Sequence, residues 1–206
     1  MVGRPRGSEG AELLDIARES FLAEGFAGTT MDAIATRARI SKSSLYRDHP
    51  SKDALYAAVV ADWVRRGRDA MRPHVEQLLA ADEPAAALLQ FARALQNGIL
   101  STPVLRMRAL VAAESQRFPD VGRAYVEQSW NRNMRMLADA IAELQRRRVL
   151  RPADPLTAAQ QFTWLTIAEP LNEWELLGEN RGADPVRLAR LAESAVAMFV
   201  ARYGSS

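Results

Sequence analysis

The stretch from Thr29 to Lys52, TTMDAIATRARISKSSLYRDHPSK, carries many hydroxyl and cationic side chains between two short apolar runs. From Arg37 onward it holds five cations against a single acid, Asp48. Such groups contact the phosphate oxygens and base edges of nucleic acids. Acids and bases balance from Glu76 onward, so the cationic excess is confined to the N-terminal part. This local excess favours a nucleic-acid contact there.

Other kinds of chemistry find little support in the residue types. The two histidines, His49 and His74, lack the spacing of metal ligands, and the chain has no cysteine. The sequence contains no glycine-rich phosphate loop and no recognisable pair of carboxylates. We therefore predict no catalytic residue, no metal site and no cofactor.

The composition is that of a folded protein outside the membrane. Of the 206 residues, 48% are hydrophobic, which suits a packed core, and the net charge is only +2. No apolar run approaches the roughly 18 residues that span a membrane. The N-terminal MVGRPRGSEG lacks the apolar segment of a signal peptide. The absence of cysteine, and therefore of disulfides, suits the reducing cytoplasm. We therefore expect a cytoplasmic protein and, since no apolar run could span a bilayer, no membrane partner.

Hydrophobic periodicity predicts helices throughout and therefore an all-α fold. The first helix is expected from near Ser8 to Gly25, since glycine suits a helix end. Pro50 ends the third helix, and Pro170 predicts a kink in a later one. Later helices are expected from Asp82-Glu83-Pro84, from Thr102-Pro103, from Pro119-Asp120 to Arg148, from Asp154-Pro155 to Leu177, and from Asp184-Pro185 to Tyr203.

Three short helices precede a longer one in the first 70 residues or so, and the length of chain between Ala38 and Lys42 suits a helix-turn-helix corner. Residues 8–54 are expected to form a three-helix, helix-turn-helix DNA-binding domain. Residues 55–204 are expected to form a larger helical domain, joined to the first through a continuous fourth helix. The residues that can cap the second, third and fourth helices are Thr30, Ser41 and Ser51.

The third helix has a polar outer face if Leu45 points inward. In a helix-turn-helix, the second helix of the motif enters the major groove. Lys42 can then donate to guanine, and the hydroxyls of Ser44 and Tyr46 can donate to phosphate. The alternative is that Thr30 and Ser41 act only as caps and that Tyr46 covers the edge of a small core. The predicted DNA contacts are Thr30, Lys42, Ser43, Ser44, Tyr46, Arg47 and Lys52.

The segment TTMDAIATRARISKSSLYRDHPSKDALYAAVV resembles the DNA-binding segment of TetR/AcrR-family transcriptional regulators, notably at ISK, LYR, PSK and ALY. The resemblance implies a two-domain helical fold in which residues 55–204 serve effector binding and dimerisation. It also implies a homodimer on a palindromic double-stranded DNA operator and release by a small-molecule effector. By position, Lys42, Ser43 and Arg47 match base-reading places. The positions that match phosphate contacts are Thr30, Ser44, Tyr46 and Lys52.

Three residues depart from the family pattern in this segment. Arg39 stands where a turn glycine is common, which predicts a strained corner or a different turn. Asp48 stands where His or Tyr often lies near phosphate, so its acid must be turned away or paired with a neighbouring cation. His49 replaces a usual phenylalanine and weakens the local core.

The segments AAESQRFPDVGRAYVEQ and VLRPADPLTAAQQFTWL resemble the effector domain of one branch of the same family. Two apolar helices from each subunit could form a four-helix interface. The alternative is that their residues form the core of one chain. The predicted dimer contacts are Leu156, Ala159, Leu188, Leu191, Ala195 and Phe199. The predicted ligand contacts, whose aromatic and thioether groups suit an adaptable cavity, are Met107, Leu110, Trp130, Met134, Phe162 and Trp164.

These observations predict a sequence-specific DNA-binding regulator, namely a repressor released from its operator by a small apolar or amphipathic ligand. One alternative is a DNA-binding regulator gated by a protein partner. Another is a helical ligand carrier or enzyme with a helix-turn-helix-like corner of no function.

Overall fold

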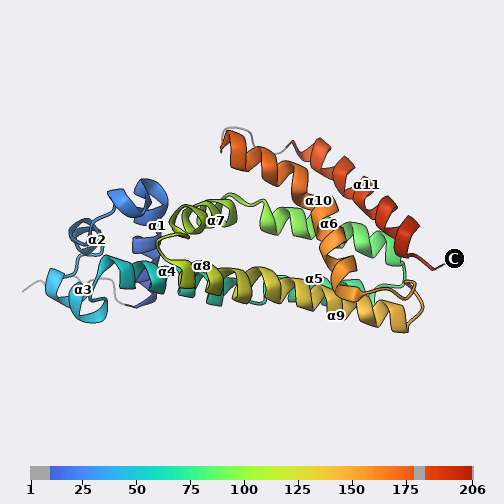
Figure 1. Ribbon diagram of the computed structural model, residues 1–206, viewed down its shortest axis with the longest axis horizontal. Coiled ribbons are helices and arrows are strands. Elements are labelled where there is room, and N and C mark those ends of the chain that lie inside the picture. Colours follow the sequence, from blue (N-terminus) through green and yellow to red (C-terminus); the bar gives the residue numbers. More distant parts are fainter. Residues whose placement is uncertain (1–9, 179–183, 206) are drawn as a thin grey trace, which may run out of the picture. The chain divides into compact units, whose positions relative to one another are not determined.

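The computed structural model describes residues 10–178 and 184–205, and within these ranges the only β-type pairing is one antiparallel bridge between Leu150 and Gly204. The all-α prediction is confirmed. The helices (Figure 1) are α1 (Ala11–Gly28), α2 (Met31–Arg37), α3 (Lys42–Asp48), α4 (Lys52–Gly67), α5 (Arg72–Ala80), α6 (Pro84–Ile99), α7 (Thr102–Glu114), α8 (Pro119–Tyr125), the π-helical segment η1 (Val126–Asn131), α9 (Arg132–Arg146), α10 (Pro155–Leu177) and α11 (Pro185–Tyr203).

The chain folds into two compact units. The first contains the described residues up to Arg68 together with Arg106–Gln128, and the second contains Asp69–Leu105 and the described residues from Ser129 onward. The expected boundary between residues 54 and 55 falls within α4, and the structure keeps the whole of α4 in the first unit. No helix in the described parts of the chain is long and apolar enough to cross a membrane.

The first unit is built around an aromatic cluster. The ring of Phe26 packs against Phe21, Tyr56 and Phe118, with centroid distances of 5.8, 5.4 and 5.0 Å. The chain turns sharply at Gly25, whose φ of 68° lies in the left-handed region that glycine adopts without strain. Burial raises the pKa of Tyr56 to about 12, with a smaller contribution from the negative charge of Glu114. Tyr56 therefore stays neutral in this core.

Most helix starts lie where the sequence predicts them. Proline occupies the first turn of α6, α8, α10 and α11, where its missing N–H costs no helical hydrogen bond. The carboxylate of Asp154 accepts from the backbone N–H of Thr157 at 2.7 Å, and that of Asp184 accepts from Val186 at 3.0 Å. The long helix expected from Pro119 to Arg148 is instead α8, η1 and α9 in succession, so one stretch has π-helical hydrogen bonding.

The core of the second unit is formed largely by α6, α9, α10 and α11. The ring of Phe162 on α10 lies 6.1 Å from that of Phe91 on α6 and 4.9 Å from that of Phe199 on α11. Phe199 in turn contacts Tyr203, whose hydroxyl hydrogen-bonds to the side chain of Gln161 at 2.5 Å. Aromatic contacts therefore join three of the four helices.

Pro170 lies inside α10, where its ring nitrogen cannot donate to the carbonyl of Thr166 one turn earlier. The side-chain amide of Gln96 on α6 donates to that carbonyl at 3.2 Å, and also to the carbonyl of Leu188 on α11 at 3.0 Å. Gln96 is buried, and its bond to Thr166 forms away from water. One glutamine thus supplies the donor that the proline withholds and links three helices.

Replacing Gln96 by Leu is expected to lower the free energy of unfolding by about 1–3 kcal/mol, because a buried carbonyl loses its donor. Urea titration measures this change. Gln90→Leu, at an exposed position of the same helix, is the matched control and is expected to stay within about 0.5 kcal/mol of the wild type. In a Pro170→Ala background the loss should shrink, since an alanine at that position would restore a backbone donor. An unchanged loss there would refute the link between the two residues.

Candidate nucleic-acid interface

The short helix α3 is held by one apolar anchor and one polar cap. Leu45 is fully buried in the core of the first unit. The hydroxyl of Ser41 accepts from the backbone N–H of Ser44 at 3.1 Å, and in the same way the hydroxyl of Thr30 caps α2 by accepting from Ala33 at 3.1 Å. Both predicted capping roles are confirmed, and they fix where α2 and α3 begin.

The corner between α2 and α3 turns through Arg39, whose φ of 55° lies in the left-handed region. A side chain there costs free energy that glycine would not. The backbone N–H of Arg39 donates to Thr36 at 3.1 Å, and that of Ile40 donates to Ala35 at 3.1 Å, so the corner's hydrogen bonds close the end of α2. The strained corner predicted from the missing glycine is therefore present.

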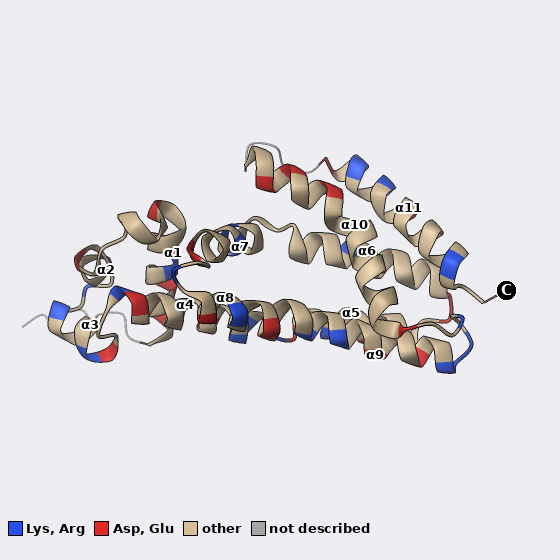
Figure 2. Ribbon diagram, in the orientation of Figure 1, with Lys and Arg blue, Asp and Glu red and all other residues tan. Residues whose placement is uncertain are grey.

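The outer face of α3 is polar and open to solvent. Lys42, Ser43, Tyr46 and Arg47 are all exposed, whereas Ser44 is half-buried. Figure 2 shows the lysine and arginine positions of α3 at the end of the first unit. The hydroxyls of Ser43 and Ser44 lie 2.9 and 3.1 Å from that of Ser41, so the first turn of α3 presents a linked row of hydroxyl groups.

Each cation on α3 has a carboxylate neighbour. The ammonium group of Lys42 lies 2.5 Å from Asp32 on α2, and the Nε of Arg47 lies 3.1 Å from Asp48. All four side chains are more than half exposed, so solvent screens both ion pairs and their net contribution to stability is small. A phosphate or a base edge can therefore compete for either cation. The acid at position 48 is paired with Arg47, one of the two outcomes expected from the sequence.

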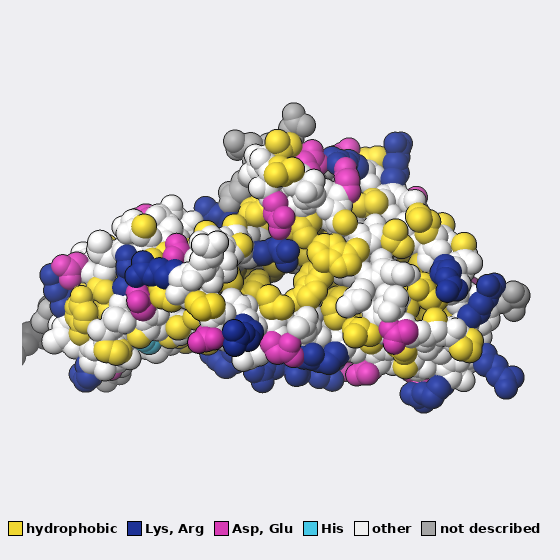
Figure 3. All heavy atoms as spheres, in the orientation of Figure 1, with side chains coloured by type: hydrophobic (Ala, Val, Ile, Leu, Met, Phe, Trp, Pro, Cys, Tyr) yellow, Lys and Arg dark blue, Asp and Glu magenta, His cyan; other side chains and the backbone are white. Residues whose placement is uncertain are grey.

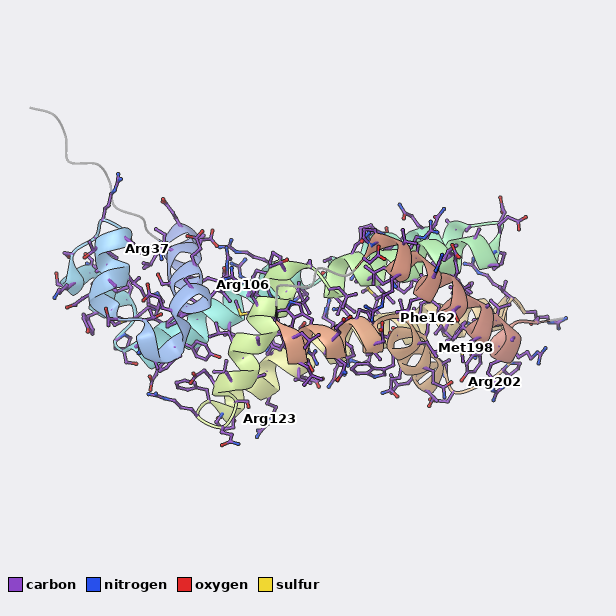
Figure 4. The ribbon with its side chains drawn as sticks, turned by 90° about the horizontal axis from the view of Figure 1, so that it is seen from above. Arg37, Arg106, Arg123, Phe162, Met198 and Arg202 are labelled. Carbon is purple, nitrogen blue, oxygen red and sulfur yellow. The ribbon has the colours of Figure 1, made fainter. Side chains whose placement is uncertain are left out.

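Two other cations of the Thr29–Lys52 stretch are engaged within the first unit. Arg37 donates to the hydroxyl of Ser20 at 2.7 Å and to the carboxylate of Glu19 at 3.2 Å, which ties α2 to α1 (Figure 4). The ammonium of Lys52 donates to the carbonyls of Phe26 at 2.7 Å and Thr29 at 2.8 Å, near the C-terminal end of α1.

The position of the Lys52 ammonium was not expected from the sequence. It also lies 4.4 Å from the centroid of the Phe26 ring, over the aromatic cluster. A cation there complements the partial negative charge at a helix C-terminus. The group of Lys52 that suits phosphate is therefore its backbone N–H in the first turn of α4, a position without an acceptor inside the helix.

The predicted ligand contacts divide between the two units. Met107 and Leu110 are buried in the core of the first unit. In the second unit Phe162 is a central core residue and Met134 is buried, whereas the rings of Trp130 and Trp164 meet at 5.2 Å. The structure therefore brings the two tryptophans together, on η1 and α10.

The predicted dimer contacts differ in exposure. Ala159, Ala195 and Phe199 are fully buried within the single chain, because α6, α10 and α11 pack on one another. Leu188 and Leu191 are half-buried, and Leu156 is exposed. Met198 on α11, 57% exposed, was not among the predicted contacts, although its neighbour Phe199 was (Figure 4). Hydrophobic side chains also appear over α10 and α11 in the space-filling view (Figure 3).

Two family models match the chain. The model described as bacterial regulatory proteins, tetR family, matches residues 13–59, which include the α2–α3 corner. The model described as AefR-like transcriptional repressor, C-terminal domain, matches residues 86–205, more than half of the chain. No curated relative matches significantly.

Solved structures with the same fold match this chain along nearly its whole length. A TetR-family transcriptional regulator from Mesorhizobium loti is 30% identical, with a TM-score of 0.87 over 93% of this chain and 95% of that one. The flavonoid-responsive regulator FrrA is 28% identical, with a TM-score of 0.69 over 95% and 98%. A TetR-family regulator from Pseudomonas syringae is 22% identical, with a TM-score of 0.73 over 93% and 95%, and shares the fold.

Lys52→Met is expected to lower the free energy of unfolding by about 1.5–3 kcal/mol, because the carbonyls of Phe26, Ala27 and Thr29 lose a charged donor. Chemical denaturation measures the change. Lys42→Met is the matched control. Among the residues that the structure describes, the exposed Lys42 pairs only with exposed Asp32, so its loss should cost under about 1 kcal/mol. Equal losses in the two variants would contradict the structural role of Lys52.

Proposed function

The chain belongs to the TetR family of bacterial regulatory proteins, and we propose that it represses transcription by binding a palindromic DNA operator as a homodimer. The observation that carries this proposal is the outer face of α3, where Lys42, Ser43, Tyr46 and Arg47 are exposed while Leu45 is buried. A helix with this division of residues can enter a major groove without unfolding. The cytoplasm, where the chromosome lies, is the expected compartment.

In the proposed complex α3 lies in the major groove. Lys42, Ser43 and Arg47 read base edges, and the two cations exchange their carboxylate partners for DNA. The hydroxyl of Tyr46 donates to a phosphate oxygen. The remaining proposed phosphate contacts are made by Thr30, Ser44 and the backbone N–H of Lys52.

We place the proposed dimer interface on the exposed faces of α10 and α11. Leu156, a predicted contact, and Met198, which directly precedes Phe199, are large exposed apolar side chains, and Leu188 and Leu191 still present part of their surface. Ala159, Ala195 and Phe199 would support this surface from below. A two-fold dimer would hold its recognition helices roughly 34–36 Å apart, one turn of DNA.

We further propose that an apolar or amphipathic small molecule binds the second unit and releases the DNA. The match to a repressor C-terminal domain supports repression, and the named response of the 28%-identical FrrA to flavonoids supports a small-molecule effector. Within this unit the candidate contacts are Trp130, Met134, Phe162 and Trp164. To turn a mostly binding-competent population into a mostly incompetent one, the effector must favour the second state by about 5 kcal/mol.

Selection from random duplex DNA with the purified protein tests the proposed function. A palindromic motif with half-sites about one helical turn apart is expected, and its binding should weaken steeply with salt as counterions are released. Met198→Arg should give a monomer in light scattering and lose the preference for paired half-sites. Val126→Arg, at an exposed apolar position outside α10 and α11, is the control and should remain dimeric. Failure to enrich any motif would refute sequence-specific binding.

Lys42→Ala is expected to weaken binding to the selected motif by about 1–3 kcal/mol, because a base loses its donor. Fluorescence anisotropy with the motif and with scrambled duplex measures both affinities. The loss should be larger on the motif than on the scrambled DNA. The same loss on both would assign Lys42 to phosphate rather than to a base.

A further inference from the structure

Two buried side-chain oxygens within residues 10–178 and 184–205 make no hydrogen bond: Oγ1 of Thr163 and Oδ1 of Asn133. Thr163 has no exposed surface at all. A buried polar atom without a partner costs about 1–3 kcal/mol, and most such atoms in native proteins are paired. Their presence in the second unit indicates polar groups that would be satisfied by a bound ligand.

The neighbouring Thr166 shows that the helix itself could have satisfied Thr163. The hydroxyl of Thr166 donates to the carbonyl of Phe162 one turn earlier, at 2.7 Å. This is the ordinary solution for a buried threonine in a helix, yet Thr163 does not adopt it. In Asn133 only the side-chain nitrogen is satisfied. Its Nδ2 donates to the carbonyl of Ser129 at 3.0 Å, which fixes the orientation of the amide and leaves Oδ1 without a partner.

Along the chain, both residues lie within one helical turn of one of the paired tryptophans. Thr163 directly precedes Trp164 on α10, and Asn133 follows Trp130 by three residues on the continuous helical stretch of η1 and α9. The two rings meet at 5.2 Å with an interplanar angle of 40°. Trp164 nevertheless leaves 42% of its surface exposed, so a third aromatic ring can stack on it.

The backbone is irregular at the same place. Trp130 lies in η1, whose π-helical hydrogen bonding replaces the regular α-helical ladder. Short π-helical segments are uncommon and occur often at functional sites. An irregular backbone, an aromatic pair and two unpartnered buried oxygens thus coincide on neighbouring helices.

We propose that the effector is an aromatic compound bearing a hydroxyl group, whose ring stacks on Trp164 beside Trp130 and whose hydroxyl hydrogen-bonds to Thr163 and Asn133. The carboxamide oxygen of Asn133 can only accept, so the ligand must donate to it. The hydroxyl of Thr163 can donate or accept, so it can pair with the oxygen of the same ligand group. This inference rests on the proposed function and names the chemistry of its effector.

Calorimetric titration with 2-naphthol and naphthalene tests the proposal. A site that is built to hydrogen-bond a hydroxyl should bind 2-naphthol at least about tenfold more tightly than naphthalene, because naphthalene leaves the two oxygens unpartnered. Thr163→Val should reduce this preference to about twofold or less while leaving the melting temperature unchanged or higher, since it removes an unsatisfied buried group. Thr163→Ser should keep the preference.

Thr166→Val is the matched control, because it removes a satisfied hydroxyl of the same helix and should leave the preference intact. Equal binding of the two compounds, binding of neither, or a preference that survives Thr163→Val would overturn the proposal. DNA binding is measured separately. If the protein binds its selected motif but not 2-naphthol, the proposed function stands and this inference is refuted. If the Thr163-dependent preference is present but the protein binds no DNA motif, this inference stands and the proposed function is refuted.

Discussion

The burial of Leu45 is the constraint on which the proposed DNA-binding surface depends. A helix of seven residues is far too short to be stable alone, so α3 exists because Leu45 is packed in the core and Ser41 caps its first turn. Full burial of a leucine contributes about 1.5–3 kcal/mol. It also fixes the rotation of the helix about its axis, and so it determines that Lys42 and Tyr46 face outward.

The cations between Thr29 and Lys52 have different roles, and the contacts of each side chain determine its role. Lys42 and Arg47 are exposed and paired with exposed acids, so they can change partners. Arg37 and Lys52 are bonded to α1 and hold the first unit together. A count of positive charges treats the four alike. Fewer cations of this stretch can therefore exchange their partners for DNA than the sequence suggests.

The sequence predicted those features that are set by local chemistry. Helix starts at proline, serine and threonine follow from neighbouring backbone groups, as Ser41 and Pro155 illustrate. Features set by contacts distant in sequence were missed. The engagement of Lys52 depends on carbonyls more than twenty residues away, and the full burial of Phe199 depends on how α6 and α10 pack against α11. Periodicity marks an apolar face without telling a subunit contact from a core.

The pairing of Gln96 with Pro170 restricts the order in which these two positions can change during evolution. If Pro170 is replaced first, the new residue brings an N–H for the carbonyl of Thr166, and Gln96 becomes partly redundant. If Gln96 is replaced first, that carbonyl is stranded and the protein loses stability. Lineages that change both positions are therefore expected to replace Pro170 before Gln96. Chains that keep the proline without the glutamine should be rare.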